Sequence, residues 1–426
     1  MINFFADKKN HDFLRLWWAQ LISQFGDRLN QMALIGLVAE RAFGSTWDLT
    51  KILSFTIFPV FIIGPIAGVY VDRWDRRKTL FVCDLIRCLL VLTIPFLFMG
   101  RDSMVPIYIV VFLIFCFSRF YVPAKMSIIP DIVPAENLLL ANSLITTTGM
   151  IAFVLGCALG GFIVDIIGPR AGFIGDAVTF GAAAALVFSI RKDFHLKIDR
   201  QRIMSAGRDF IRIERSVFGE IKEGIRYLSS QRDIRFIINM LFVLLAAAGS
   251  AYVIIIIFIQ KTFHSITKDL GVLAVFLGIG LFLGSLVYGR WGKKVAMDKT
   301  IFLCLMAAGG MTIVFATMVG TYPNILLAAL LSFFLGFVIG PIFIAANTVV
   351  HIVSDEAMRG KVFSALEIVI HFAFLAAMVI SSLLSEIFAP AWILVGVGTL
   401  CIVVGLIGLA RLKTGAGLAI KEGNMA

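Results

Sequence analysis

The polar side chains best suited to do chemistry lie near the start of the chain, inside an otherwise apolar segment. Their spacing of four, three and four residues places them on one face of a helix. They are Gln20, Gln24, Asp27 and Gln31, with Ser23 and Asn30 beside them. In a membrane, a charged carboxyl group costs about 3 kcal/mol unless it is paired or hydrated. We therefore expect this face to border a water-filled cavity, where Asp27 can bind and release a proton or contact a bound molecule.

A structural interpretation of Asp27 stays open beside this one. Asp27 can pair permanently with a basic group and only hold helices together. Arg28 is poorly placed for that pair, because adjacent residues of a helix point about 100° apart. Asp84 and Arg87 lie three residues apart on a later apolar segment. We expect these two side chains to pair with each other or with the charged loop at 72–78, and to serve the structure.

Four other ionisable residues have simple structural explanations. Arg119 and Lys125 flank the inner end of an apolar segment. We expect the Arg119 side chain to extend from this helix end to the membrane surface, and binding of an anionic group stays open as the alternative. Asp165 and Asp176 flank a predicted outward turn, where we expect water to solvate them.

Three polar residues in the C-terminal part of the chain are further candidates for the cavity. Glu367 and His371 lie four residues apart, on one face of a predicted span. His371 can relay a proton or hold a cation next to Glu367, or the two can form ordinary hydrogen bonds between helices. Asn347 is a weaker candidate near the end of another span. No cluster of cysteine, histidine and acidic residues supports a metal site.

Composition places the chain in the membrane. It has 426 residues, of which 60% are hydrophobic and 15% are charged, and its mean hydropathy is +0.96. Apolar runs of about 20 residues recur along its whole length, as helices that cross a bilayer require. The sequence has no P-loop, GxSxG or HExxH motif, so we expect neither an enzyme nor a bound cofactor. It predicts an all-α, multi-pass membrane protein.

We predict twelve spans in two halves of six. The halves cover 1–190 and 235–426, and the polar segment 191–234 joins them. Apolar residues at helical spacing around 218–228 predict an amphipathic helix in that segment. The spans lie at about 13–41, 50–71, 79–99, 104–122, 143–164, 170–189, 235–259, 270–289, 300–319, 323–346, 362–384 and 389–410.

The distribution of positive charge predicts the orientation. The net charge is +11, but most lysines and arginines fall in alternate loops and in the central segment. We assign this basic side to the cytoplasm, together with both termini. The charge then reflects topology and attraction to anionic lipids, and not binding to nucleic acid. The expected location is the inner (plasma) membrane.

The charged loop GVYVDRWDRRK at 68–78 carries a family resemblance. A shortened copy of residues 72–77 returns at 289–294, which indicates two related halves. The loop resembles the signature between spans two and three of the major facilitator superfamily, although Asp75 stands where that family usually has glycine. The matching residues are Gly68, Asp72, Arg73, Arg76 and Arg77.

The resemblance implies a major facilitator fold and makes this loop a gating latch, in which Asp72 contacts a helix of the other half. A second interpretation stays open, in which the basic residues of the loop only anchor the hairpin on the cytoplasmic side. The stretches SQFGDRL, FYVPAKMSIIPDIVPAENLLLANSL and RGKVFSALE are similar to the drug, macrolide and siderophore efflux branch. That branch implies a secondary active transporter that exports an amphipathic small molecule by proton antiport and alternating access. A monomer is the default oligomeric state.

Three alternatives to drug export stay open. The GDR triplet in the first span also resembles iron-exporting members, so a divalent metal cation is one alternative substrate. A lysophospholipid flippase is the second. The third is a sensor that binds its ligand without transporting it.

Overall fold

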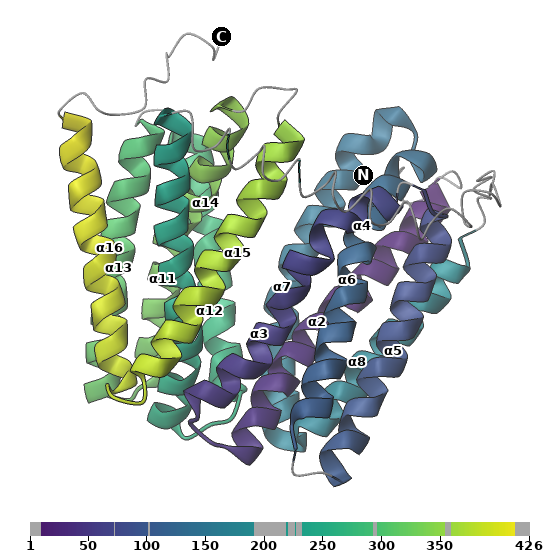
Figure 1. The fold of residues 1–426 in the computed structure, drawn as a ribbon, viewed down its shortest axis with the longest axis horizontal. Helices are drawn as coiled ribbons and strands as arrows, with labels where there is room; N and C mark the ends of the chain where they lie inside the picture. Colours follow the sequence, from purple (N-terminus) through teal and green to yellow (C-terminus); the bar gives the residue numbers. More distant parts are fainter. Residues whose placement is uncertain are drawn as a thin grey trace. The chain divides into compact units, whose positions relative to one another are not determined.

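The computed structural model describes residues 10–71, 73–100, 103–190, 219, 226, 232–292, 296–353 and 359–413. These residues form long α-helices, and no strand occurs among them (Figure 1). The predicted helix around 218–228 and the side chain of Asp72 lie outside this part of the chain. The all-α prediction is confirmed for the residues that the structure describes.

The first part of the chain contributes α2 (His11–Arg41), α3 (Thr46–Ile62), α4 (Gly64–Val71), α5 (Arg76–Gly100), α6 (Val105–Ile132), a 3-10 turn (Ala135–Asn137), α7 (Leu138–Ile167) and α8 (Pro169–Phe188). The second part contributes α11 (Arg232–Phe263), α12 (Lys268–Trp291), α13 (Met297–Thr321), α14 (Ile325–Val353), α15 (Arg359–Leu384) and α16 (Pro390–Lys413).

Ten helices in the described ranges are long and apolar enough to cross a membrane. The helix α3 is shorter, with 17 residues, and the polar face of α2 lowers its hydropathy. The second predicted span is divided into α3 and α4 at Ile63, next to the Gly64–Pro65 step, because proline cannot donate the main-chain hydrogen bond of a continuous helix. Ten of the twelve predicted spans thus correspond to these ten helices. The other two, at about 13–41 and 50–71, fall on α2 and on the α3–α4 pair, and they stay predictions.

The chain forms two compact units, each with its own apolar core. The first comprises 1–43, 51–219 and 266–271, and the second comprises 44–50, 220–265 and 272–426. In the first unit, α2 packs on α7 and α8, and α5 packs on α6 and α8. Phe13 of α2, Leu80 of α5 and Ile128 of α6 are fully buried in its core. This packing brings the polar faces of α2, α5, α6 and α8 together.

In the second unit, α13 packs on α14 and α16, and α11 packs on α15 and α16. Glycines let α12 and α14 approach at the level of their backbones. A methyl group added at Gly280 or Gly284 would collide with the carbonyl of Phe333 or Phe337 on α14. Gly336 meets the α12 backbone in the same way, as expected for small residues at helix contacts in membranes.

The connection from α7 to α8 depends on one glycine conformation. Gly168 has φ of +98°, a region that side chains disfavour. It ends α7, and Pro169 then starts α8 at its first position, where the missing N–H of proline costs nothing. The sharp turn sets α8 alongside α7 and α2.

Candidate functional site

The polar face of α2 divides into a buried part and a half-exposed part. Gln20 is 1% exposed, and its Nε2 donates to the carbonyl of Ile145 on α7 at 3.2 Å. Nearby, Trp17 Nε1 donates to Thr148 Oγ1 at 2.7 Å. These bonds place Gln20 in the contact between α2 and α7, apart from the half-exposed residues further along α2.

The next residues of this face also turn toward α7. Gln24 is half-buried beside Gly149. Arg28 Nη1 donates to Gln31 Oε1 at 2.9 Å, and its guanidinium lies 4.9 Å from the centre of the Phe153 ring. Arg28 is therefore engaged on the α7 side, in line with the prediction that it is poorly placed to pair with Asp27.

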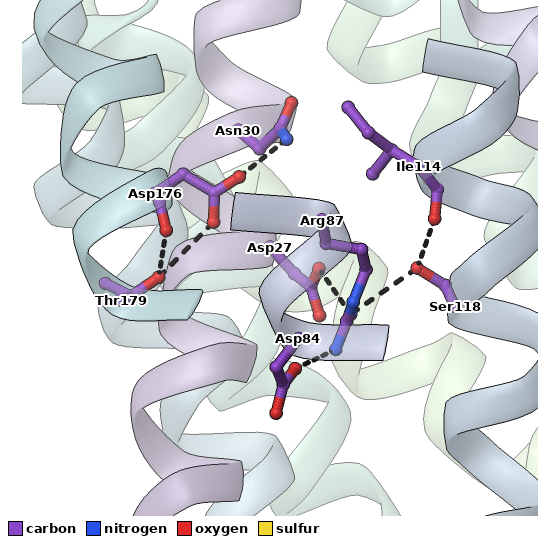
Figure 2. Close-up of polar contacts among 8 residues, drawn as sticks. All are labelled: Asp27, Asn30, Asp84, Arg87, Ile114, Ser118, Asp176 and Thr179. Atoms are coloured by element: carbon purple, nitrogen blue, oxygen red, sulfur yellow. Dashed lines mark hydrogen bonds and ion pairs between the residues drawn. The ribbon is translucent and has the colours of Figure 1, made fainter. Parts of the chain in front are cut away.

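Asp27 faces α5, where it joins a buried ion pair. Arg87 Nη1 lies 3.8 Å from Asp27 Oδ1, and the other terminal nitrogen of Arg87 binds Asp84 Oδ1 (Figure 2). The three side chains differ sharply in exposure: Asp84 is 0% exposed and Arg87 2%, whereas Asp27 is 41% exposed. The expected pairing of Asp84 with Arg87 is thus observed, and Asp27 is a third member. We call these three residues the ion group.

The Arg87 guanidinium is held from several sides. Its centre lies 4.6 Å from the Tyr121 ring and 4.2 Å from the Phe180 ring, a favourable arrangement for a cation. Arg87 Nη1 also lies 3.5 Å from Ser118 Oγ, which itself donates to the carbonyl of Ile114 (Figure 2). Helices α5, α6 and α8 together fix the cation, so it offers a rigid positive charge to Asp27.

A second cation lies near the ion group. Lys125 of α6 is 8% exposed and interacts electrostatically with both Asp27 and Arg87. Packing of α6 on α5 and α4 encloses this side chain, which the sequence places only at the inner end of a predicted span. Asp27 is thus a half-exposed carboxyl group that faces two buried cations. Such a group can lose its ionic partner when it gains a proton, or bind a cation in place of Arg87.

Asp176 of α8 lies beside the ion group but outside it (Figure 2). It is 0% exposed, so the prediction that water solvates it is wrong. Asn30 Nδ2 donates to Asp176 Oδ2 at 2.6 Å, and Thr179 Oγ1 lies 3.3 Å from Oδ1. Gly26 of α2 makes room for this carboxyl, since a methyl group there would lie 2.5 Å from Asp176 Oδ1.

Asp165 at the end of α7 also has protein partners. Its Oδ1 accepts the main-chain N–H groups of Ile266 at 2.9 Å and Thr267 at 3.0 Å. Thr267 Oγ1 donates in turn to the carbonyl of Gly161. Asp165 is half-buried, so these protein partners come in addition to the solvent contact that the sequence predicts. It caps the start of α12, in the segment 266–271 that belongs to the first unit.

The basic loop after α4 is tied to neighbouring helix ends. Arg76 forms an ion pair with Asp131 and donates to the carbonyl of Ser127 at 2.9 Å, both on α6. Arg77 donates to the carbonyl of Phe188 at the end of α8. Arg73 is exposed, and Gly68 has open space around its Cα. The described part of the loop therefore anchors α5 to α6 and α8, and the role of Asp72 stays a prediction.

The candidates in the second unit have simpler surroundings. His371 Nδ1 lies 2.8 Å from the main-chain carbonyl of Glu367, one turn earlier on α15, while the Glu367 side chain is exposed. The side chain of Asn347 lies outside the described residues. Within the described residues, no group of three histidine, cysteine or acidic side chains is arranged to hold a metal ion.

Comparison with known proteins decides the family. The profile of the Major Facilitator Superfamily matches residues 16–264 and 236–419, nearly the whole chain. The chain belongs to the major facilitator superfamily. It is therefore an integral membrane protein of a transporter family, and the predicted family and fold are confirmed.

Two relatives and one solved structure show where the similarity lies. The chain is 28% identical over 362 residues to the uncharacterized MFS-type transporter YkuC of Bacillus subtilis, across 83% of this chain and 81% of YkuC. It is 25% identical over 296 residues to macrolide efflux protein A of Streptococcus pyogenes, across 66% and 67% of the two chains. A POT family transporter crystallised with 5-aminolevulinic acid superposes with a TM-score of 0.72 at 12% identity, across 94% and 96%.

Sequence reasoning makes Asp27 a candidate but does not predict most of its surroundings. Asp84 and Arg87 were recognised as a pair, without their link to α2. The contacts of Tyr121 and Ser118 with Arg87 cannot be predicted from the sequence, because aromatic and hydroxyl residues are common in membrane-spanning helices. Asp176 offered the one available signal, a lone acid within an apolar run, but its position near a predicted turn suggested solvent.

Proposed function

We propose that this transporter exports an amphipathic small molecule in exchange for protons, and that Asp27 carries the coupled proton. The contrast in exposure within the ion group supports this most directly. Asp84 and Arg87 are buried and in direct contact, whereas Asp27 is 41% exposed and stands 3.8 Å from the same guanidinium. Only a group that water or substrate can reach is able to exchange a proton in each cycle.

The charge of Asp27 links proton binding to the attraction between α2 and α5. When Asp27 is ionised, it attracts Arg87 and Lys125 across the helix contact. A bound proton removes that attraction, while Arg87 keeps Asp84 as its partner. A cationic or polar part of the substrate would compete with the proton for the same ionised carboxylate, which is the condition for antiport.

The remaining features of the proposal come from the family resemblance. The halves 1–190 and 235–426 would give alternating access, with the loop at 68–77 as the latch and both termini in the cytoplasm. Similarity to macrolide efflux protein A favours an amphipathic substrate and export across the plasma membrane. The divalent cation alternative gains no support from the described residues, in which no three potential ligands converge.

The test is proton release from proteoliposomes with an acidic interior, followed with a pH-sensitive dye. A panel of macrolides, other amphipathic drugs and siderophores would be added to wild type and to Asp27→Asn. We expect some compounds to release protons with wild type and none to do so with Asp27→Asn. The matched control is Asp12→Asn, which removes a carboxylate near the start of the same helix, where it pairs with Arg15 at 2.8 Å.

Three outcomes separate the parts of the proposal. Proton release by Asp12→Asn but not by Asp27→Asn supports Asp27 as the coupling residue. Equal release by all three proteins keeps the antiport and rejects Asp27. No release by folded wild type with any compound rejects proton-coupled export of this substrate class.

A further inference from the structure

The acid beside the ion group has a different role from Asp27. We propose that Asp176 is a protonated acid that positions α2 against α8 and keeps its proton while Asp27 exchanges one. The argument begins with its place in the fold. Asp176 is fully buried between α8 and α2, and its neighbours Phe173 and Phe180 on α8 are also 0% exposed. Water has no access to its carboxyl group.

No cation neutralises this carboxyl group directly. Among the residues that the structure describes, no lysine, arginine or histidine forms an ion pair with Asp176. Asp176 interacts electrostatically with Asp27 of α2 and with Arg87 of α5. The thiol of Cys88 on α5 also interacts electrostatically with Asp176. Arg87 already binds Asp84 and faces Asp27, so its positive charge is balanced by these two carboxylates and not by Asp176.

A buried carboxylate needs strong compensation, and here it is weak. Its partners are two neutral donors, the Asn30 amide at 2.6 Å and the Thr179 hydroxyl at 3.3 Å. The Thr179 hydroxyl has a shorter bond to the main-chain carbonyl of Asp176, at 2.7 Å. Neutral hydrogen bonds do not offset the removal of an ionised group from water. A bound proton removes the charge and avoids adding a further anion next to the carboxyl groups of the ion group.

The contact with Asn30 also suits an acid. A separation of 2.6 Å is ordinary for O–H···O and short for N–H···O. Asn30 Oδ1 is buried and has no hydrogen-bond partner among the described residues. Turning the Asn30 amide by 180° would bring this oxygen to the Asp176 carboxyl, where it could accept the acid proton. Asp176 would then be a donor that ties α8 to α2, one turn of helix from Asp27.

The test is infrared spectroscopy of the full chain in lipid nanodiscs at neutral pH, with aspartate labelled with ¹³C at the carboxyl carbon. We expect wild type to show the C=O band of a protonated aspartic acid. Asp176→Asn should remove this band, and Asp27→Asn should retain it. Asn30→Ala should keep the band and move it to higher frequency, because a hydrogen bond to the acid is lost.

Transport provides the second measurement, and this part alone rests on the proposed function. Asp176→Asn, which mimics the neutral acid, should keep proton-coupled export within about twofold of wild type, whereas Asp27→Asn should abolish it. A spectrum that Asp176→Asn leaves unchanged would overturn the inference, and so would loss of proton coupling in folded Asp176→Asn. If Asp176→Asn fails to fold, an Asn30→Ala band without any shift overturns it. Absence of transport in wild type would reject the proposed function and leave the infrared result intact.

Discussion

Removing the charge of Arg87 should destabilise the protein strongly, and removing Asp84 as well should restore part of the loss. In Arg87→Gln, the fully buried Asp84 loses its cation, which typically costs about 3–5 kcal/mol of unfolding free energy. The contacts of Arg87 with the Tyr121 and Phe180 rings add about 0.5–2 kcal/mol. The contribution of Asp27 is below about 1 kcal/mol, because at 3.8 Å and 41% exposure solvent screens the pair.

The double variant Asp84→Asn/Arg87→Gln tests this explanation, because its stability should be higher than that of Arg87→Gln alone. Asp84→Asn alone should cost about 1–3 kcal/mol, because Arg87 loses its charge-assisted hydrogen bond but still faces Asp27. In Asp84→Asn/Arg87→Gln no charge is buried without a partner. The double variant should therefore be more stable than Arg87→Gln alone, with a coupling of about 1–3 kcal/mol.

The assay is reversible unfolding in mixed micelles, with the free energy measured for the two single variants and the double variant. Arg76→Gln serves as the matched control, because its pair with Asp131 is more exposed, at 32% and 36%. We expect that control to cost about 1 kcal/mol or less. Additive effects of the two substitutions, or an Arg87→Gln cost no larger than that of Arg76→Gln, would refute the account of a buried pair.

Two further predictions concern helix packing, and both use the same unfolding measurement. Gly26→Ala should cost about 1–3 kcal/mol, because its methyl group would collide with a carboxyl and a hydroxyl group on α8. Gly310→Ala, which meets open space on α13, should be neutral or stabilising by up to about 1 kcal/mol; equal effects at the two glycines would contradict the packing. Trp17→Phe should cost about 1 kcal/mol through the lost bond to Thr148, and an unchanged stability would count against that bond.

Much of the fold follows from local patterns. Apolar runs of bilayer length predict each long helix, and the Gly64–Pro65 step marks the break between α3 and α4. The loop at 68–78 identifies the family, because its charges recur at a fixed place in a repeated architecture. The pairing of Asp84 with Arg87 was also predictable, since residues three apart share one helix face.

The candidate site was only partly predictable, for a physical reason. Helical spacing placed Gln20 and Asp27 on one face of α2, yet α7 covers Gln20 while Asp27 stays half-exposed. The error at Asp176 has the same origin. Its place near a predicted turn suggests contact with water, but neighbouring helices enclose it.

The sequence by itself determined that this chain is a helical membrane protein, which segments form its long helices, and which side chains share a helix face, because these properties depend on neighbours within one or two turns. Tertiary structure alone decided that Asp27 meets Arg87, that two rings enclose this cation, and that Asp176 faces Asn30. These contacts join α2, α5, α6 and α8. How each of these helices is rotated and how deeply it is buried depends on packing between segments that are distant in the sequence. The close approach of helices at Gly26 is one example, and local sequence patterns do not predict it.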